Sequence, residues 1–262
     1  MRVELPESFE KRMQEMLGDE YESYIESYDN PRQYGLRINP MKITEEELAE
    51  GSGFSLDPIP WTKTGYFYKE EDQPARHPYY SAGLYYLQEP SAMTPAARFP
   101  VEPGERVLDL CAAPGGKATA LGAALQGKGV LVANDISNSR AKALLKNLEV
   151  FGISNAFVTN EVPQNLAERF EGFFDKVLID APCFRRGDVP QRSGGDQNLG
   201  GRTPGVLCKL QKDILKNGVR MLRPGGKTAV FHLYLCSGRK RGKYLLDPGA
   251  VSGDGTDSHR RI

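Results

Sequence analysis

The chain has 262 residues, of which 39% are apolar and 26% are charged, and its 34 lysines and arginines balance 34 aspartates and glutamates. A net charge of zero excludes a protein that binds nucleic acid by overall positive charge, although a local basic surface stays open. No apolar run approaches the ~18 residues of a membrane span, and the first residues carry no secretory signal. We therefore expect a cytoplasmic protein with no membrane partner.

The cysteines exclude two further classes of protein. Cys111, Cys183, Cys208 and Cys236 are too few and too scattered for a disulfide framework. No CxxC pair or cluster of histidine and cysteine indicates zinc, so we expect no metal site. Reduced thiols are the expected state.

The first part of the chain, residues 1–99, is charged and rich in tyrosine. Apolar residues near helical spacing in 6–28 predict one or two helices, and YGLRIN (34–39) predicts a short strand. Thr44, which precedes three glutamates, is typical of a helix N-cap. These features indicate a smaller α+β domain at the N-terminal side.

Predicted strands and helices alternate over residues 100–180. The strands are expected at 106–110, 129–134, 155–158 and 176–180, and the helices at 117–125, 138–151 and 163–170. This alternation favours a parallel sheet with crossover helices, and such sheets bind ligands beyond the carboxyl ends of their strands. Periodicity is then lost over 184–208, before a helix at 209–222, a turn at 223–226 and the start of a strand.

Small residues fill the first loop at that edge of the predicted sheet. In VLDLCAAPGGKAT (107–119), Ala112, Ala113, Gly115 and Gly116 let a ligand approach the backbone closely. The N-terminus of the following helix offers free N–H groups to a carboxylate or a phosphate. The alternative is a tight turn that binds no ligand.

Two acidic residues follow at later strand ends. Asp135 is placed to accept the ribose hydroxyls of a nucleoside cofactor, with a helix N-cap as the alternative. FDKVLIDAPC (174–183) brings Asp180 and Cys183 to the same edge, where a thiol beside a carboxylate suits nucleophilic or acid/base chemistry. The alternative for Cys183 is a small buried apolar side chain. The missing third glycine of the loop argues against a dinucleotide.

These motifs together resemble one family. LDLCAAPGGKAT, Asp135 and DAPC, with YGLRIN and HPYYSAGLYYLQEPSAMTPA (77–96), are similar to the Nol/Nop/Sun family of RNA cytosine-5 methyltransferases, in its bacterial RsmF-like branch. The resemblance covers residues 1–183 and 209–230. It implies an α/β fold, with a Rossmann-like S-adenosylmethionine-dependent methyltransferase domain over 100–230 and an RNA-binding-type domain over 1–99. It also implies that the substrate is ribosomal RNA, and we expect the protein to be a monomer.

The resemblance also implies which residues bind the cofactor. They are Cys111, Ala112, Ala113, Pro114, Gly115, Gly116, Lys117, Asp135, Glu161 and Asp180. The loop would surround the methionine part, Asp135 would hold the ribose, and Asn160 with Glu161 would contact the adenine, where the family more often has aspartate. Arg140 is expected to be a helix-surface or packing residue. RNA would bind through basic residues that are otherwise ordinary solvated charges, among them Arg32, Arg37, Lys42 and Arg76.

The mechanism of the family requires two cysteines. A thiolate adds to C6 of cytosine, C5 takes the methyl group, and a base removes the C5 proton before the thiolate leaves. The attacking cysteine belongs to a TC motif after a PGG turn, and the cysteine of DAPC assists product release, which is the role implied for Cys183. Asp180 would face the N3 and amino edge of the base.

The sequence departs from the family directly after Cys183 and again after the turn at 223–226. Codons that encode VFHLYLCSGRKRG (230–242) spell the family-like YSTCTFAPEENE when read one base further on, and codons for CFRRGDVP (183–190) spell CSGEGMFR when one base is removed. We therefore expect frame changes in the gene, with 184–208 out of frame and 231–262 an out-of-frame disordered tail. The family's nucleophile position would then be lost.

Three functions remain open at this point. Cytosine-5 methylation of ribosomal RNA, impaired in the chain as written, is the first. The second is a catalytically inactive remnant that binds the cofactor or RNA. The third is methylation of a small molecule or protein, against which DAPC argues because methylation of amines and oxygens needs no thiol. If the loop and tail are merely divergent, Cys236 is the alternative nucleophile.

Overall fold

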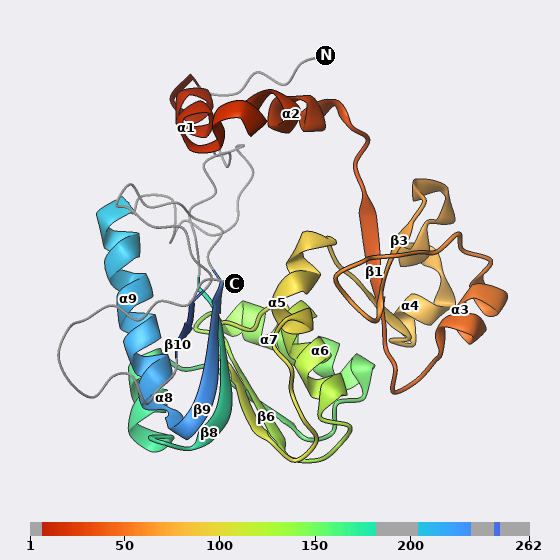
Figure 1. Cartoon of the computed structure of the whole chain (residues 1–262). Helices are drawn as coiled ribbons and strands as arrows, with labels where there is room; N and C mark the ends of the chain where they lie inside the picture. The colour runs from red at the N-terminus through yellow and green to blue at the C-terminus, as the bar shows by residue number, and fades with distance from the viewer. Residues whose placement is uncertain (1–6, 182–203, 232–243, 247–262) are drawn as a thin grey trace.

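A computed structural model describes residues 7–181, 204–231 and 244–246 of the chain (Figure 1). Two sheets organise these residues: an antiparallel sheet of four strands near the N-terminus, and a larger sheet of six strands. None of the helices described is long and apolar enough to span a bilayer.

Helices α1 (Glu7–Leu17) and α2 (Tyr21–Glu26) lead into the small sheet, and each is followed by a 3-10 turn. They confirm the helices predicted over 6–28. In Figure 1 they form the red ribbon that an extended segment joins to strand β1. The short helical elements that follow the first strand are α3 (Glu45–Ser52), η3 (Glu70–Asp72), η4 (Pro74–Arg76), α4 (Pro78–Ser81), η5 (Ser91–Met93) and α5 (Thr94–Ala97).

The small sheet has only short strands. In spatial order they are β2 (Asp57–Pro58), β3 (Gly65–Tyr68), β1 (Tyr34–Ile38) and β4 (Tyr85–Leu87), and every neighbouring pair is antiparallel. Leu36 and Ile38 of β1 pack with Leu48 of α3 in a core of their own. The strand predicted at 34–39 is confirmed, whereas the other three are too short to leave a clear alternation in the sequence.

The large sheet confirms the expected Rossmann-like architecture. Its strands, in spatial order, are β10 (Tyr244–Leu246), β9 (Leu222–Phe231), β8 (Phe174–Asp180), β5 (Arg106–Asp109), β6 (Val130–Asn134) and β7 (Ala156–Thr159). Strands β5 to β9 are parallel, and β10 is antiparallel to β9. The carboxyl ends of the parallel strands therefore meet at one edge.

Helices cover both faces of the large sheet (Figure 1). Val107 and Leu131 join one core with α6 (Gly116–Ala124) and α7 (Asn138–Phe151). Leu108 and Val132, the next residues along the same strands, join the opposite core with α8 (Pro163–Arg169) and α9 (Pro204–Arg220). This switch of face from one residue to the next is the period of a β-strand.

Two segments differ from what the sequence led us to expect. Helix α9 begins at Pro204, inside the stretch 184–208 that we expected to be out of frame. Strand β10 lies inside 231–262, and it pairs with β9 through Tyr244 and Val230. The expectation that 231–262 is an out-of-frame disordered tail otherwise stays a prediction, because Tyr244–Leu246 are the residues of this stretch beyond Phe231 that the structure describes.

Candidate functional site

The loop between β5 and α6 forms the centre of the carboxyl edge. Its backbone is tied to neighbouring strands, because Leu110 N–H donates to the Leu178 carbonyl at 3.0 Å and Ala112 N–H donates to the Asn134 carbonyl at 2.8 Å. Gly115 stands at the N-cap of α6 with φ +119°, a conformation that favours glycine. With no side chain at the N-cap, the N-terminus of α6 stays open to an anionic group.

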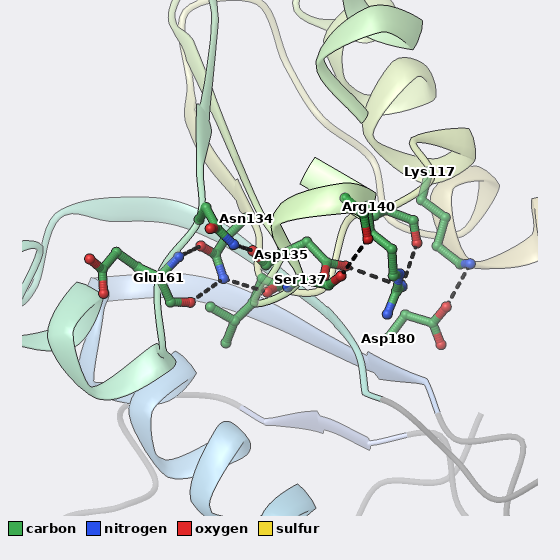
Figure 2. Close-up of polar contacts among 11 residues, drawn as sticks. Lys117, Asn134, Asp135, Ser137, Arg140, Glu161 and Asp180 are labelled. Atoms are coloured by element: carbon green, nitrogen blue, oxygen red, sulfur yellow. Dashed lines mark hydrogen bonds and ion pairs between the residues drawn. The ribbon is translucent and has the colours of Figure 1, made fainter. Parts of the chain in front are cut away.

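Asn134 holds three strand ends together, and sequence analysis did not identify this role. Its buried amide donates to the Leu110 carbonyl at 3.2 Å and to the Glu161 carbonyl at 3.0 Å. Its amide oxygen accepts from Thr159 Oγ1 at 2.9 Å and from Glu161 N–H at 3.0 Å. One side chain thus connects the loop after β5 with the ends of β6 and β7 (Figure 2). The only signal in the sequence was its place beside Asp135.

Asp135 lies at the centre of this edge and is only 3% exposed. One carboxylate oxygen accepts Ser137 N–H at 2.9 Å, and the other lies 3.1 Å from the guanidinium of Arg140. Arg140 also donates to the Ala113 carbonyl at 2.9 Å, so it bridges the glycine loop and the acidic residue (Figure 2). Arg140 is exposed on the surface of α7, as expected, and the bridge to Asp135 is a contact that the sequence did not predict. The N-cap position of α7 belongs to Ser137, not to Asp135.

Lys117 and Asp180 form an ion pair across the edge. Their side chains meet at 2.6 Å, Lys117 from the first turn of α6 and Asp180 from the end of β8 (Figure 2). Both are partly exposed, so a ligand at this edge can reach them. Two residues proposed from separate motifs are thereby brought into direct contact.

The two residues after β7 fit their expected role less closely. Glu161 is exposed, and its carboxylate accepts from Asn165 of α8 at 2.7 Å. Asn160 donates its side-chain amide to the Asp135 carbonyl at 2.7 Å. Figure 2 shows the Glu161 carboxylate directed away from Lys117 and Asp180. Glu161 therefore shares the edge with Asp135 through its backbone bonds to Asn134, while its side chain contacts α8.

Two apolar side chains at this edge are exposed although they flank the polar cluster. Ile136, directly after Asp135, is 60% exposed, and Val162, directly after Glu161, is 46% exposed. Large apolar side chains beside buried polar groups are typical of a ligand site that a flat apolar group covers. Together with the open N-terminus of α6 and the carboxylate of Asp135, they match the parts of a nucleoside linked to an amino acid.

Cys111 is the cysteine whose side chain the structure describes, and its surroundings disfavour the thiolate form. Burial raises the pKa of the Cys111 thiol to about 12, and the nearby carboxylates of Asp109, Asp135 and Asp180 add to the shift. The thiol therefore stays protonated at neutral pH. Cys183 and Cys236, for which we expected catalytic or accidental roles, lie outside the described residues.

One glycine of the loop has a different neighbour from the one expected. A Cβ at Gly116 would lie 3.0 Å from Gln88 Nε2 and 3.3 Å from Tyr86 Cε1, both from the small-sheet side of the chain. The absence of a side chain at Gly116 therefore lets Gln88 and Tyr86 pack against this turn, and the expectation that its backbone also approaches a ligand stays a prediction.

The basic residues expected to bind RNA differ in exposure and in the contacts that their side chains make. Arg37 is only 4% exposed, so its assignment as an RNA contact is wrong. Lys42 is exposed, but its ammonium donates to the carbonyls of Ala82 and Val150 at 2.8 and 2.6 Å. Arg32 lies over the Tyr34 ring, and Arg76 bonds to Gln73 on the surface.

Comparisons with known proteins match both parts of the chain. Residues 5–90 match the family described as the N-terminal domain of 16S rRNA methyltransferase RsmF. Residues 97–237 match the family described as 16S rRNA methyltransferase RsmB/F. The second match covers more than half of the chain.

Individual relatives agree with these families. The chain is 34% identical over 237 residues to ribosomal RNA small subunit methyltransferase F of Vibrio campbellii, covering 86% of this chain and 49% of the relative. It is 34% identical over 216 residues to 25S rRNA (cytosine-C(5))-methyltransferase nop2 of Schizosaccharomyces pombe, covering 80% of this chain and 36% of the relative. The chain thus spans about half the length, or less, of the curated relatives it matches.

A solved structure has the same fold. A methyltransferase homologue from Pyrococcus horikoshii superposes with a TM-score of 0.74 at 29% identity, covering 87% of this chain and 73% of that one. NSun6 from the same organism, solved with SFG, superposes with a TM-score of 0.69 at 16% identity, covering 86% and 82%. At that identity the second likeness supports the fold alone.

Proposed function

The chain belongs to the 16S rRNA methyltransferase RsmB/F family, and from this membership we propose that it derives from an enzyme that transfers a methyl group from S-adenosylmethionine to C5 of a cytosine in ribosomal RNA. We also propose that the chain is a cytoplasmic monomer. The observation that carries the proposal is the meeting of three features at one sheet edge. They are the open N-terminus of α6, the carboxylate of Asp135, and the ion pair of Lys117 with Asp180.

The residues at this edge fit the parts of the cofactor, which supplies an electrophilic methyl group when it is bound. The backbone N–H groups of the first turn of α6 would bind its carboxylate. Asp135 would accept the ribose hydroxyls, because its paired oxygens each keep a free lone pair. Ile136 and Val162 would cover the two sides of the base. Arg140, whose side chain is 43% exposed, can move aside without disturbing the core.

Asp180 would act on the target cytosine. Its carboxylate is partly exposed and is held by Lys117 at 2.6 Å, so it can accept a hydrogen bond from the exocyclic amine of the base. A carboxylic acid at the same place can protonate N3, which makes C6 more electrophilic. Lys117 orients this carboxylate from the first turn of α6, beside the proposed donor site. The ion pair would thus connect the site of the methyl donor with that of the cytosine.

We further propose that the chain as written lacks methyl transfer. Cys183 would assist product release, but the family's nucleophile has no counterpart in 230–242 as the sequence stands. The second candidate function is therefore a cofactor-binding or RNA-binding protein without turnover. Arg37 is buried and cannot contact RNA. Helices α1 and α2 carry acidic residues in their first turns, which disfavours them as an RNA-binding surface.

Calorimetry with S-adenosylhomocysteine tests the donor site directly. We expect the whole chain to bind this product, and Asp135→Asn to weaken binding about tenfold or more, because the amide keeps the shape but loses the charge that attracts hydroxyl donors. Glu161→Gln is the matched control, and it should change the dissociation constant by less than about threefold, since its carboxylate contacts Asn165. Absence of binding by the unaltered chain would refute the donor site.

A further inference from the structure

Arg37 is a buried cation that crosses from the small sheet to the donor loop. It lies on β1, yet its guanidinium Nη2 donates to the Gly116 carbonyl at 2.8 Å and to Thr119 Oγ1 at 2.7 Å, both in the first turns of α6. Its Nε donates to Gln88 Oε1 at 3.4 Å. An arginine of the N-terminal part thus binds the helix that begins at the proposed cofactor site.

The surroundings of this arginine are unusual for a charged group. Among the described residues, the acceptors of its hydrogen bonds are all uncharged oxygens, and its guanidinium carbon lies 5.9 Å from the Tyr86 ring centre and 5.6 Å from that of Phe151. Burial lowers the pKa of Arg37 to about 10, which still leaves it charged at neutral pH. A buried charge with no acidic partner among the described residues is costly, so its presence here points to a role beyond filling space.

The packing of Gly116 is an independent sign that this contact is built. A methyl group there would lie 3.0 Å from Gln88 Nε2, closer than nearly all real contacts of this kind. Gln88 is itself fixed, because its Nε2 donates to the Ala92 carbonyl at 3.0 Å. The donor loop and the small sheet therefore meet at a position where only glycine fits without displacement.

We propose that Arg37 is a positioning residue for the methyl-donor site, which fixes the first turn of α6 from the N-terminal sheet. This inference rests on the proposed function, since it assigns the N-terminal part a role in donor binding rather than in RNA contact. Lys117 lies between the two α6 residues that Arg37 binds, and it forms the ion pair with Asp180. A shift of this turn would move both the helix N-terminus and that pair.

Two variants and a control distinguish a role of Arg37 in positioning the first turn of α6 from a role in merely holding the N-terminal sheet against the large domain. Arg37→Met removes all the hydrogen bonds but keeps an unbranched apolar stem in the buried space. Thr119→Val keeps the shape of the side chain but removes one acceptor of Arg37, together with the bond that the Thr119 hydroxyl donates to the Gly115 carbonyl at 2.8 Å. Lys42→Met is the matched control, because Lys42 ties the same N-terminal part to Val150 at the end of α7 without contact to the donor loop.

Two measurements are made on each whole chain. The first is the dissociation constant for S-adenosylhomocysteine. We expect it to rise about tenfold in Arg37→Met and a few-fold in Thr119→Val, and to stay within about twofold in Lys42→Met. The second is amide hydrogen exchange of the free protein over 111–122, which should quicken in Arg37→Met and stay unchanged in Lys42→Met.

Each outcome decides between the roles. Equal weakening in Arg37→Met and Lys42→Met, or unchanged binding and exchange in Arg37→Met, overturns the positioning role while the proposed function stands. If the unaltered chain does not bind the probe, the proposed function fails, and hydrogen exchange alone then decides whether Arg37 orders the turn. If Arg37→Met does not fold, Thr119→Val carries the same comparison, and its unchanged binding and exchange would overturn the role.

Discussion

Asp109, at the end of β5, is a buried carboxyl group whose two oxygens have no hydrogen-bond partner among the described residues. Burial raises its pKa to about 7, an effect that the nearby charge of Lys117 opposes and that of Asp180 reinforces. The carboxyl group is therefore more easily protonated in the folded chain than in the unfolded chain, and the stability of the fold depends on its protonation.

The pH dependence of folding is expected to reveal Asp109. Between pH 4 and 7 the unfolded chain has released this proton while the folded chain retains it, so this group lowers the free energy of unfolding as pH rises through that window. Asp109→Asn has no carboxyl group at this position, so its free energy of unfolding does not include this pH dependence. In urea unfolding, its stability relative to the unaltered chain should therefore increase from pH 4 to 7 and then level off.

A matched control identifies the group responsible. Asp57→Asn alters an exposed carboxylate of β2 and should leave the slope of the unaltered chain in place. A stability difference for Asp109→Asn that does not vary with pH would show that Asp109 ionises normally in the folded chain.

Sequence analysis identified single site residues better than the contacts between them. Asp135, Asp180 and Lys117 follow recognisable motifs, and they do meet at one edge. The role of Asn134 was not predicted, because its amide nitrogen donates to main-chain carbonyls from two separate segments, at Leu110 and Glu161. A side chain that bonds to carbonyls leaves no partner residue type for a sequence pattern to register.

At the scale of elements, periodicity predicted the large sheet well and the small sheet poorly. The strands β5, β6 and β8 are buried apolar runs that alternate with helices, and both signals survive in the sequence. The strands of the small sheet have few residues each, and their order joins β1 between β3 and β4. Local patterns contain no information on such pairing of distant strands.

The sequence predicted the N-cap of α3 at Thr44, and the contribution of this cap to stability can be measured. Thr44 Oγ1 accepts Glu47 N–H at 3.2 Å, and the Glu47 carboxylate accepts Thr44 N–H at 2.9 Å. Thr44→Ala should lower the free energy of unfolding by about 1 kcal/mol, as measured by urea denaturation. Thr44→Ser keeps the acceptor and should lie close to the unaltered chain. Equal loss in both variants would mean that the Thr44 methyl group, not the cap, is what matters.

At the scale of the whole molecule, the frame hypothesis predicts a separation of binding from turnover. The chain as written should bind S-adenosylhomocysteine yet transfer no methyl group to ribosomal RNA, measured by mass spectrometry of the digested RNA. A gene with the two reading frames restored should encode the TC motif and transfer the methyl group.

Two further results test this hypothesis. Methylation by the chain as written, abolished in Cys236→Ser, would make Cys236 the nucleophile and refute the frame hypothesis. Sequencing of the DNA that encodes 180–262 completes the test, because intact codons with no shifted base would also exclude frame changes.

The contact between the two sheets also bears on how such chains evolve. Arg37, Asn39 and Lys42 reach across from one short stretch, and on the far side Gly116, Phe151 and Val150 offer their main-chain carbonyls. A carbonyl is present whatever side chain its residue carries, so substitutions at Phe151 and Val150 leave the bonds from Asn39 and Lys42 intact, whereas Gly116 is also constrained by Gln88. At these two contacts the donor side chain is the constrained partner, so co-variation of Asn39 or Lys42 with the residue that accepts its bond should be weak.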